Sequence, residues 1–345
     1  MPKRITIKEI AKLANVSIGT VDRALHDRSR VAQATKDKIL EIAKKGNYSS
    51  NIYARSLKLN RTYQIAVVLP DNNPYWDKHR AGISRGMSEF GDMGFAQQEY
   101  RISTTREADR IAAIEQALAD EPDGLILTPN MLKIGGRAME LLSQTEVPFV
   151  FVDADMEGVD NLSFVGQDTF QSGRMAGSIL QNPYTHDYSV WVVTLSESDA
   201  QNKAIKTRIA GLESFYKNDP TVKIIHINLE KDGLSIDELK RQMREAKLAV
   251  HLFIPNSKSH LLMNELHDIR EQAKMRVIGY DLVDENVDCL QKGWVDVVID
   301  QQPIMQGYLA VQSLYKYLIL KSEVTKNQYL PLDIITKENL KYCDY

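Results

Sequence analysis

The stretch ITIKEIAKLANVSIGTVDRAL, residues 5–25, holds two short helical patterns joined by three residues. Thr6 and Glu9 have the spacing of a capping box in front of an apolar stripe at helical period. The spacing predicts a first helix over residues 7–14 and, after a turn that ends in the helix-capping Ser17, a second helix. Two short helices joined so tightly indicate a helix-turn-helix.

A third helical pattern follows over residues 35–45, with its apolar positions on one side. Gly46-Asn47 predicts that this helix ends in a left-handed conformation. Three such helices bury enough apolar surface to fold as a small all-α unit. We expect this unit to occupy residues 1–48.

The charge of the chain is divided unevenly around this module. The 345 residues have a formal net charge of -3, but residues 1–62 hold 14 Lys and Arg against 5 Asp and Glu, which is about +9. The remainder holds 29 basic and 41 acidic residues, about -12. A basic module joined to an acidic body is expected when one part contacts a polyanion and the other does not.

The module resembles the DNA-binding headpiece of the LacI/GalR (lactose repressor) family at Ile5–Ser17, Thr20–Leu25, Thr35–Ile39 and Tyr48. Residues 51–58, Asn-Ile-Tyr-Ala-Arg-Ser-Leu-Lys, resemble that family's hinge helix, which orders on DNA, pairs with its dimer mate and wedges a leucine into the minor groove. The resemblance implies an operator duplex and a second copy of the chain as partners. It divides the chain into a headpiece (1–48), a hinge helix and linker (49–61) and a sensing and dimerisation domain (62–345).

The first residues of the second helix of a helix-turn-helix reach base edges in the major groove. Arg23 is the best base reader here, whereas Ile18 offers only apolar contact and Gly19 offers no side chain. Asp22 either accepts from a cytosine amino group or pairs with a neighbouring basic side chain. The residues expected to contact DNA are Thr6, Ser17, Ile18, Gly19, Thr20, Arg23, Asn51, Ala54, Leu57 and Lys58.

From Tyr63 short apolar strands alternate with helical stretches. They are expected at 65–69, 125–128, 149–153, 190–195, 223–227, 249–254, 276–280 and 295–299. Such strands predict parallel sheets in a doubly wound α/β fold, and about 280 residues exceed one sheet core. The resemblance implies a periplasmic-binding-protein-like core of two doubly wound lobes. By that analogy lobe one holds 62–162 and 294–325, and lobe two holds 163–293 and 326–345.

In open parallel sheets ligands bind beyond the carboxyl ends of the strands. Carboxylate, amide and guanidinium groups suit adjacent sugar hydroxyls, and aromatic faces suit C–H patches. The residues expected to bind the ligand are Asn72, Asn73, Tyr75, Trp76, Asp153, Asp168, Arg208, Asn256, Asp281 and Gln301. The resemblance places Arg208, on a helix over 201–216, as the family arginine that grips ligand oxygens. Asn72 and Asn73 could instead start a turn, and Asp168 could cap the helix over 169–180.

The sequence lacks the motifs of the enzyme classes that this architecture could host. No GxGxxG, Walker, HExxH or GxSxG motif is present, and neither Cys289 and Cys343 nor the seven histidines have metal-ligand spacing. We therefore expect no enzyme activity, no cofactor and no metal. The apolar runs are far shorter than the roughly 18 residues that cross a bilayer, and the N-terminus has no signal-like apolar core, which predicts a cytoplasmic protein without a membrane partner.

These features predict a homodimeric transcription regulator, most simply a repressor, that binds a palindromic operator and responds to a small sugar or polyol between the lobes. One alternative is a regulator that needs a purine-like corepressor. An alternative of another class is a sugar-acting enzyme that uses paired carboxylates.

Overall fold

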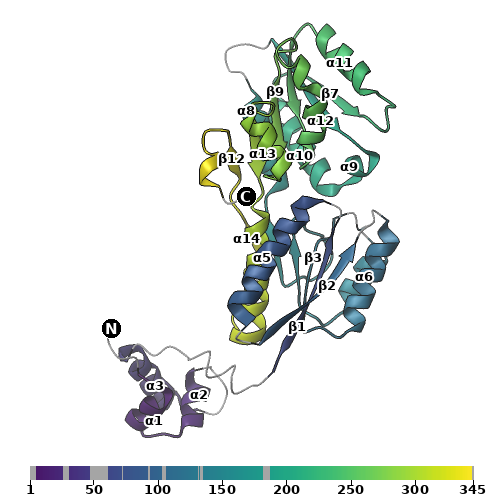
Figure 1. Ribbon diagram of the computed structural model, residues 1–345. Coiled ribbons are helices and arrows are strands. Elements are labelled where there is room, and N and C mark those ends of the chain that lie inside the picture. Colours follow the sequence, from purple (N-terminus) through teal and green to yellow (C-terminus); the bar gives the residue numbers. More distant parts are fainter. Residues whose placement is uncertain are drawn as a thin grey trace. The chain divides into compact units, whose positions relative to one another are not determined.

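The computed structural model describes residues 5–25, 31–46, 61–71, 73–91, 94–102, 106–130, 132, 135–181 and 187–343. The chain forms two compact units, residues 1–61 and 62–345. In the first unit, α1 (Ile7–Ala14), α2 (Ile18–Leu25) and α3 (Gln33–Lys45) pack around a common core (Figure 1). That core consists of Ile10, Ala11, Ala14, Val21, Ala24, Ile39 and Ala43.

Local hydrogen bonds explain the ends of the headpiece helices. The Thr6 and Glu9 side chains close the predicted capping box on α1. The Ser17 hydroxyl accepts from the backbone amide of Thr20 and caps α2. The prediction of a left-handed stop after α3 was wrong at Gly46, where φ is -87°. The glycine is needed for space, because a Cβ there would lie 2.3 Å from Cγ2 of Ile5.

The second unit contains two six-stranded sheets, each in its own lobe (Figure 1). The sheet of lobe one has the order β11-β5-β4-β3-β1-β2, and that of lobe two has the order β12-β10-β9-β8-β6-β7. All pairings are parallel except that of β12 with β10. In lobe one the strands are β1 (Tyr63–Pro70), β2 (Phe95–Ile102), β3 (Gly124–Leu127), β4 (Phe149–Val152), β5 (Ser163–Gly166) and β11 (Asn327–Tyr329). In lobe two they are β6 (Tyr188–Thr194), β7 (Lys223–Asn228), β8 (Ala249–Phe253), β9 (Arg276–Tyr280), β10 (Val297–Asp300) and β12 (Asp333–Ile335).

Helices cover the faces of these sheets, as the doubly wound prediction requires. Lobe one carries α5 (Pro74–Gly91), α6 (Glu107–Ala119), α7 (Arg137–Gln144) and α14 (Pro303–Tyr315), which runs on into a π-helical turn (Lys316–Leu320). Lobe two carries α8 (Thr169–Leu180), α9 (Glu197–Gln201), α10 (Lys203–Tyr216), α11 (Ile236–Glu245), α12 (Ser259–Leu266) and α13 (Asp284–Gln291). Short 3-10 turns lie at His267–Ile269 and Leu340–Tyr342.

The chain crosses between the lobes three times, and the predicted lobe boundaries need correction at each crossing. Residues 163–166 form β5 of lobe one, so the first crossing follows them. Residues 297–300 form β10, which pairs with β9 in lobe two, so the second crossing falls between β10 and α14 rather than before residue 294. Residues 327–329 form β11, which is still part of lobe one, so the third crossing follows them rather than preceding residue 326. Short edge strands and crossings without turn signals hide these boundaries in the sequence.

Four strands escaped the search for apolar runs. β2 is an edge strand that pairs only with β1, and most of its side chains are partly or fully exposed. β5 has four residues, of which Ser163 and Gly166 are not apolar. β11 and β12 have three residues each at the sheet edges. The predicted helix over 201–216 is also divided, because Asn202 ends α9 and caps α10.

In each lobe two helices cross with their backbones in contact, and glycine makes the contact possible. In lobe one a Cβ on Gly82 of α5 would lie 1.8 Å from the carbonyl oxygen of Ile304 in α14. In lobe two a Cβ on Gly211 of α10 would lie 2.0 Å from the carbonyl oxygen of Phe170 in α8. These close helix–helix contacts hold the first turns of α5 and α10 next to the segments in which the chain passes between the lobes. Both first turns contribute to the candidate ligand site.

Candidate functional site

The exposed face of the headpiece presents the N-terminal turn of α2. Ile18 is 46% exposed although it is large and apolar, and Gly19 is also exposed. A chain of side chains joins Ser17 to Arg23, because the Ser17 and Thr20 hydroxyls lie 2.9 Å apart and Arg23 Nη2 lies 3.4 Å from Thr20 Oγ1. The turn therefore offers an apolar tip beside a guanidinium and two hydroxyls, a set that can contact thymine methyls, guanine edges and phosphates.

The predicted DNA-contacting residues of the headpiece share this exposed setting, apart from Thr20, which is partly buried. Thr6 is also exposed, but its hydroxyl already serves the capping box of α1. The predicted hinge residues Asn51, Ala54, Leu57 and Lys58 lie outside the described residues, so their roles stay predictions.

In the second unit, loops from both lobes converge on a cavity of about 110 Å³. Eight of the ten residues predicted to bind a ligand line it: Asn73, Tyr75, Trp76, Asp153, Arg208, Asn256, Asp281 and Gln301. The sequence reasoning missed Asn130, Asp199, Asn202, Ser257 and Lys258, which also line it. Each of these follows a strand of the same two sheets within one short loop or helix, so inspecting every strand end more fully would have found them.

Asp153 forms the lobe-one side of the cavity. It directly follows β4 with a left-handed backbone, φ 69°. Its carboxylate accepts from the Tyr75 hydroxyl and from the Asn130 amide. Burial and the nearby Asp153 carboxylate raise the pKa of Tyr75 well above its usual value, so the phenol stays protonated and donates. Within the described part of the chain, the Asp153 carboxylate therefore accepts hydrogen bonds from uncharged donors alone.

Arg208 and Asp281 form the lobe-two side. The Gln301 amide donates to both oxygens of Asp281, at 2.8 and 3.0 Å, and its oxygen accepts from Arg208. Arg208 also donates to the carbonyl of Pro255 at 2.9 Å and stacks over the Tyr280 ring at 4.3 Å. Burial raises the pKa of Asp281 well above its usual range, and the charge of Arg208 opposes that rise.

Buried glutamines on the second crossing connect the two sides. The Gln306 amide donates to the backbone carbonyl of Gln301 at 2.9 Å, and its oxygen accepts from the backbone amide of Asp153 at 2.8 Å. His79 Nε2 lies 3.2 Å from the same oxygen. Two side chains and one backbone segment thus link Arg208 in lobe two to Asp153 in lobe one. Neither Gln306 nor His79 stood out in the sequence, because both sit within helices.

Three buried polar atoms at the cavity have no hydrogen-bond partner within the described part of the chain. They are the donors Arg208 Nε and Asn256 Nδ2 and the acceptor Asn130 Oδ1. A buried polar group without a partner costs roughly 1–3 kcal/mol, so such groups cluster where a ligand or water completes them. Their placement on both sides indicates that a polar ligand would bridge the lobes.

One predicted ligand residue, Asp168, stands apart from this cavity. Asp168 is exposed and caps α8, accepting from the backbone amide of Gln171 at 2.9 Å, which is the alternative role considered for it above. It lines a neighbouring cavity of about 190 Å³ with Asp155 and Lys203. Asn72 lies outside the described residues.

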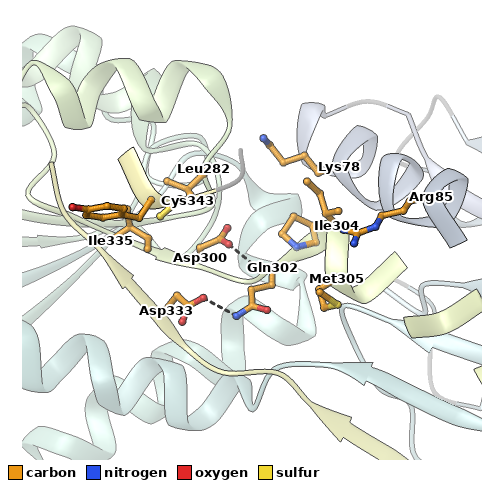
Figure 2. A pocket seen from close by; sticks show the side chains of 12 residues that line it. Lys78, Arg85, Leu282, Asp300, Gln302, Ile304, Met305, Asp333, Ile335 and Cys343 are labelled. Atoms are coloured by element: carbon orange, nitrogen blue, oxygen red, sulfur yellow. Dashed lines mark hydrogen bonds between the residues drawn. The ribbon is translucent and has the colours of Figure 1, made fainter. Parts of the chain in front are cut away.

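A larger cavity, of about 280 Å³, lies at the crossings (Figure 2). Gln302 bridges its two carboxylates, since its backbone amide donates to Asp300 and its side chain donates to Asp333, and Lys78 of α5 lines the same space. Burial raises the pKa of Asp300 to about 6. Its acidic groups already have internal partners, so the smaller cavity is the better ligand site.

Among the residues that the structure describes, no cluster of three or more His, Cys, Asp or Glu side chains could hold a metal ion. Within the same ranges no helix is long and apolar enough to span a membrane.

Family comparisons address both units. Residues 65–322 match the family described as periplasmic binding protein domain, and residues 6–51 match the family described as bacterial regulatory proteins, lacI family.

Three named relatives illustrate the likeness along the chain. This chain is 31% identical to the HTH-type transcriptional regulator RegA of Clostridium acetobutylicum over 43% of each chain. It is 25% identical to the sucrose operon repressor of Staphylococcus xylosus over 67% of this chain and 69% of that one. It is 28% identical to catabolite control protein A of Staphylococcus epidermidis over 71% of this chain and 73% of that one. The chain spans about half the length of several curated relatives that it matches, RegA among them.

Solved structures share the fold. A Bacteroides fragilis protein assigned as a LacI transcriptional regulator matches with a TM-score of 0.74 and 25% identity, over 82% of this chain and 100% of that one. A glucose-galactose binding protein, GanP, from Geobacillus stearothermophilus matches with a TM-score of 0.66 and 19% identity, over 81% of this chain and 99% of that one. The second likeness bears on the fold alone. The predicted fold class, a helix-turn-helix headpiece with a two-lobed α/β core, is confirmed.

Proposed function

Because the chain belongs to the lacI family of bacterial regulatory proteins, with a periplasmic binding protein domain as its body, we propose that it is a ligand-responsive transcription repressor. One observation carries the proposal. The chain joins a helix-turn-helix headpiece to a body in which eight predicted residues from both lobes line one polar cavity. An enzyme would not need the first part, and a transport-type binding protein would not need it either.

The headpiece would bind operator DNA through the N-terminal turn of α2. Arg23 reads a base edge, Ile18 contacts a thymine methyl, and the hydroxyls of Ser17 and Thr20 hold phosphate or base edges. The lacI-family resemblance supports a further contact, in which Leu57 of the hinge segment inserts into the minor groove and bends the duplex. A homodimer places two headpieces on a palindromic site, as two-fold symmetry requires.

The effector of this proposal is a small sugar or polyol in the inter-lobe cavity. Tyr75 and Trp76 supply aromatic surface, while Asp153, Arg208 and Asp281 supply polar groups. The sucrose operon repressor of Staphylococcus xylosus is named for a sugar, which supports this ligand class. Ligand binding shifts the lobes toward one arrangement, and operator affinity changes by the difference in ligand affinity between the two states. The protein would act in the cytoplasm, where it meets the chromosome.

A selection from random duplexes tests the DNA half of the proposal. The full chain should enrich a palindromic sequence, whereas a variant lacking residues 1–61 should enrich none and should still be stabilised thermally by the ligand. Leu57→Ala should weaken binding to the enriched duplex far more than binding to unrelated DNA, because the wedge acts only in the bent specific complex. Sequence-specific binding by the truncated chain would refute the assignment of the headpiece.

A further inference from the structure

The charged groups among the described lining residues of the inter-lobe cavity offer no surplus positive charge to an anionic ligand. The carboxylates are Asp153, Asp199 and Asp281, and the cations are Arg208 and Lys258. Lys258 Nζ lies 2.8 Å from Asp199. Both Nη atoms of Arg208 already donate, to Pro255 and Gln301, and the amide of Gln301 donates in turn to Asp281. The cations do not outnumber the carboxylates whether or not Asp281 is ionised, so a phosphate or carboxylate here would meet no surplus positive charge.

The helix N-termini at the cavity are closed to anions by asparagine side chains. Asn202 Oδ1 accepts from the amides of Ala204 and Ile205 at 2.9 and 3.2 Å at the start of α10. Asn73 Oδ1 accepts from the Tyr75 amide at 3.0 Å at the start of α5. The amides that would otherwise bind phosphate therefore have acceptors within the protein.

The polar atoms that remain suit hydroxyl groups. The free donors Arg208 Nε and Asn256 Nδ2 need an acceptor, and the free acceptor Asn130 Oδ1 needs a donor. A hydroxyl serves either need, whereas a carboxylate or phosphate at neutral pH offers mainly acceptors. A polyol with several hydroxyls can complete all three atoms at once.

The aromatic groups do not form a slot for a flat base. Tyr75 and Trp76 both lie on α5 of lobe one and pack edge to face on each other. In lobe two the ring of Tyr280 is covered by the guanidinium of Arg208. Among the described lining residues no aromatic face stands opposite them, so a purine-like base would have one stacking partner at most. The cavity of about 110 Å³ is also small beside the roughly 300–1,000 Å³ of pockets for drug-sized molecules.

We infer that the inter-lobe cavity takes an uncharged, hydroxyl-rich ligand of about the size of one sugar ring and rejects sugars that carry phosphate or carboxylate. This inference rests on the proposed function, since it names the chemical class of the effector at the same site. The cavity would thus discriminate the free sugar from its phosphorylated and oxidised forms. The regulator would then sense a nutrient before any kinase or dehydrogenase acts on it.

Matched ligand series test the inference on the full chain by calorimetry and thermal shift. The hexose series compare glucose and galactose with their 6-amino, uronate and phosphate forms. The pentose series compare xylose, arabinose and ribose with their phosphates and aldonates. The neutral member of the binding series should bind at least about 100-fold more tightly than its anionic forms, since an unpaired buried charge loses its hydration without compensation. An anionic or amino form that binds more tightly than the neutral one would overturn the inference while leaving the proposed function intact.

A pair of variants tests the electrostatic cause. Asp153→Asn removes one carboxylate charge from the cavity at constant size and should narrow the preference for the neutral sugar over the uronate by about tenfold. Asp155→Asn makes the same change on a partly exposed residue outside the cavity and should leave the preference unchanged, because solvent screens it. Equal effects of the two changes would contradict the inferred cause.

An unbiased readout covers ligands outside the series. The protein is equilibrated with a bacterial metabolite extract, and compounds retained by the wild type but not by Arg208→Gln are identified by mass spectrometry. Retained neutral polyols support the inference, and retained sugar phosphates or acids overturn it. If neither the series nor the extract yields a ligand, the proposed effector site falls and the inference falls with it.

Discussion

His79 in lobe one and Arg208 in lobe two occupy equivalent positions in two helix pairs that are built alike. Each lies three residues before the glycine at which its helix crosses its partner, Gly82 or Gly211. The carbonyl of each faces a glycine of the partner helix, since a Cβ on Gly307 would lie 2.2 Å from the His79 oxygen and one on Gly173 would lie 1.9 Å from the Arg208 oxygen. The two lobes thus carry the same scaffold at the cavity.

The two carboxylates repeat this equivalence. Asp153 follows β4 and Asp281 follows β9, with φ values of 69° and 67°. The backbone amide of each donates to the next strand, Asp153 to Val165 at 3.2 Å and Asp281 to Ile299 at 3.0 Å. Both lobes therefore aim a carboxylate at the cavity with the same backbone.

The difference lies in what holds each carboxylate. In lobe one, burial lowers the pKa of His79, so a neutral imidazole stands where lobe two has a guanidinium. Lobe one offers uncharged donors, and lobe two offers a guanidinium that an amide links to the carboxyl group. The scaffold that both lobes share determines where this side chain lies. The residue type at the position, His79 or Arg208, determines whether the group is neutral or cationic.

The crossing glycines should show the largest effect on stability and should affect both lobes alike. Gly82→Ala and Gly211→Ala each force a Cβ to within 2.0 Å of a backbone oxygen, so the helices must separate. We expect each change to lower the free energy of unfolding by about 3 kcal/mol in urea titrations. At Gly91, at the end of α5, no atom would lie within 4 Å of an added Cβ. Gly91→Ala should therefore change the free energy of unfolding by less than about 1 kcal/mol. A lobe that tolerates its alanine would break the equivalence.

The same substitution at the two equivalent positions should separate their functions. Arg208→Gln should weaken ligand binding by about 100-fold or more, because it removes the guanidinium from the cavity. His79→Gln keeps a group able to bond Gln306 behind the cavity and should change ligand affinity by less than about tenfold. Calorimetry with the ligand from the metabolite screen measures both. Equal losses would assign ligand contact to both positions.

Two cavity groups, His79 in lobe one and Asp281 in lobe two, should contribute to the pH dependence of stability with opposite signs. The lowered pKa of His79 means that its contribution is complete above its usual pKa of 6.5 and is lost as the pH falls below it, since the unfolded chain binds the proton first. The raised pKa of Asp281 means that its contribution is present below the usual 3.8 and is lost as the pH rises through the higher folded value. Each term changes stability by at most about 1.4 kcal/mol per pH unit.

Urea titrations from pH 4 to 8 measure these slopes. His79→Gln should reduce the loss of stability below pH 6.5, and Asp281→Asn should reduce the loss on the alkaline side of 3.8. If both variants change the slope in the same direction, the opposed signs are wrong.

The smallest effect is expected at Asp168, which has no counterpart among the cavity carboxylates. Asp168→Asn keeps a good N-cap on α8, so neither stability nor ligand affinity should change by more than about 0.5 kcal/mol. Thermal unfolding with and without ligand is the measurement. A loss of ligand affinity above tenfold would place Asp168 in the ligand site.

The sequence by itself determined the headpiece helices and most of the buried strands. The capping box at Thr6, the cap at Ser17 and the apolar stripes act within one or two helical turns, so the signal and the structure it specifies lie in the same few residues. The strand-end rule also brought eight of the ten predicted ligand residues to one cavity, because the carboxyl ends of parallel strands meet at one edge of a sheet.

Only the tertiary structure decided which polar groups hold one another. The Asp153 amide and its Gln306 partner are separated by 153 residues, and the Arg208–Gln301 bond joins residues 93 apart. Asp153 and Asp168 look alike in the sequence, yet one turns into the cavity and the other caps a helix. No local period encodes that choice, because it depends on how closely helices pack at glycine crossings and on where the chain passes between the lobes.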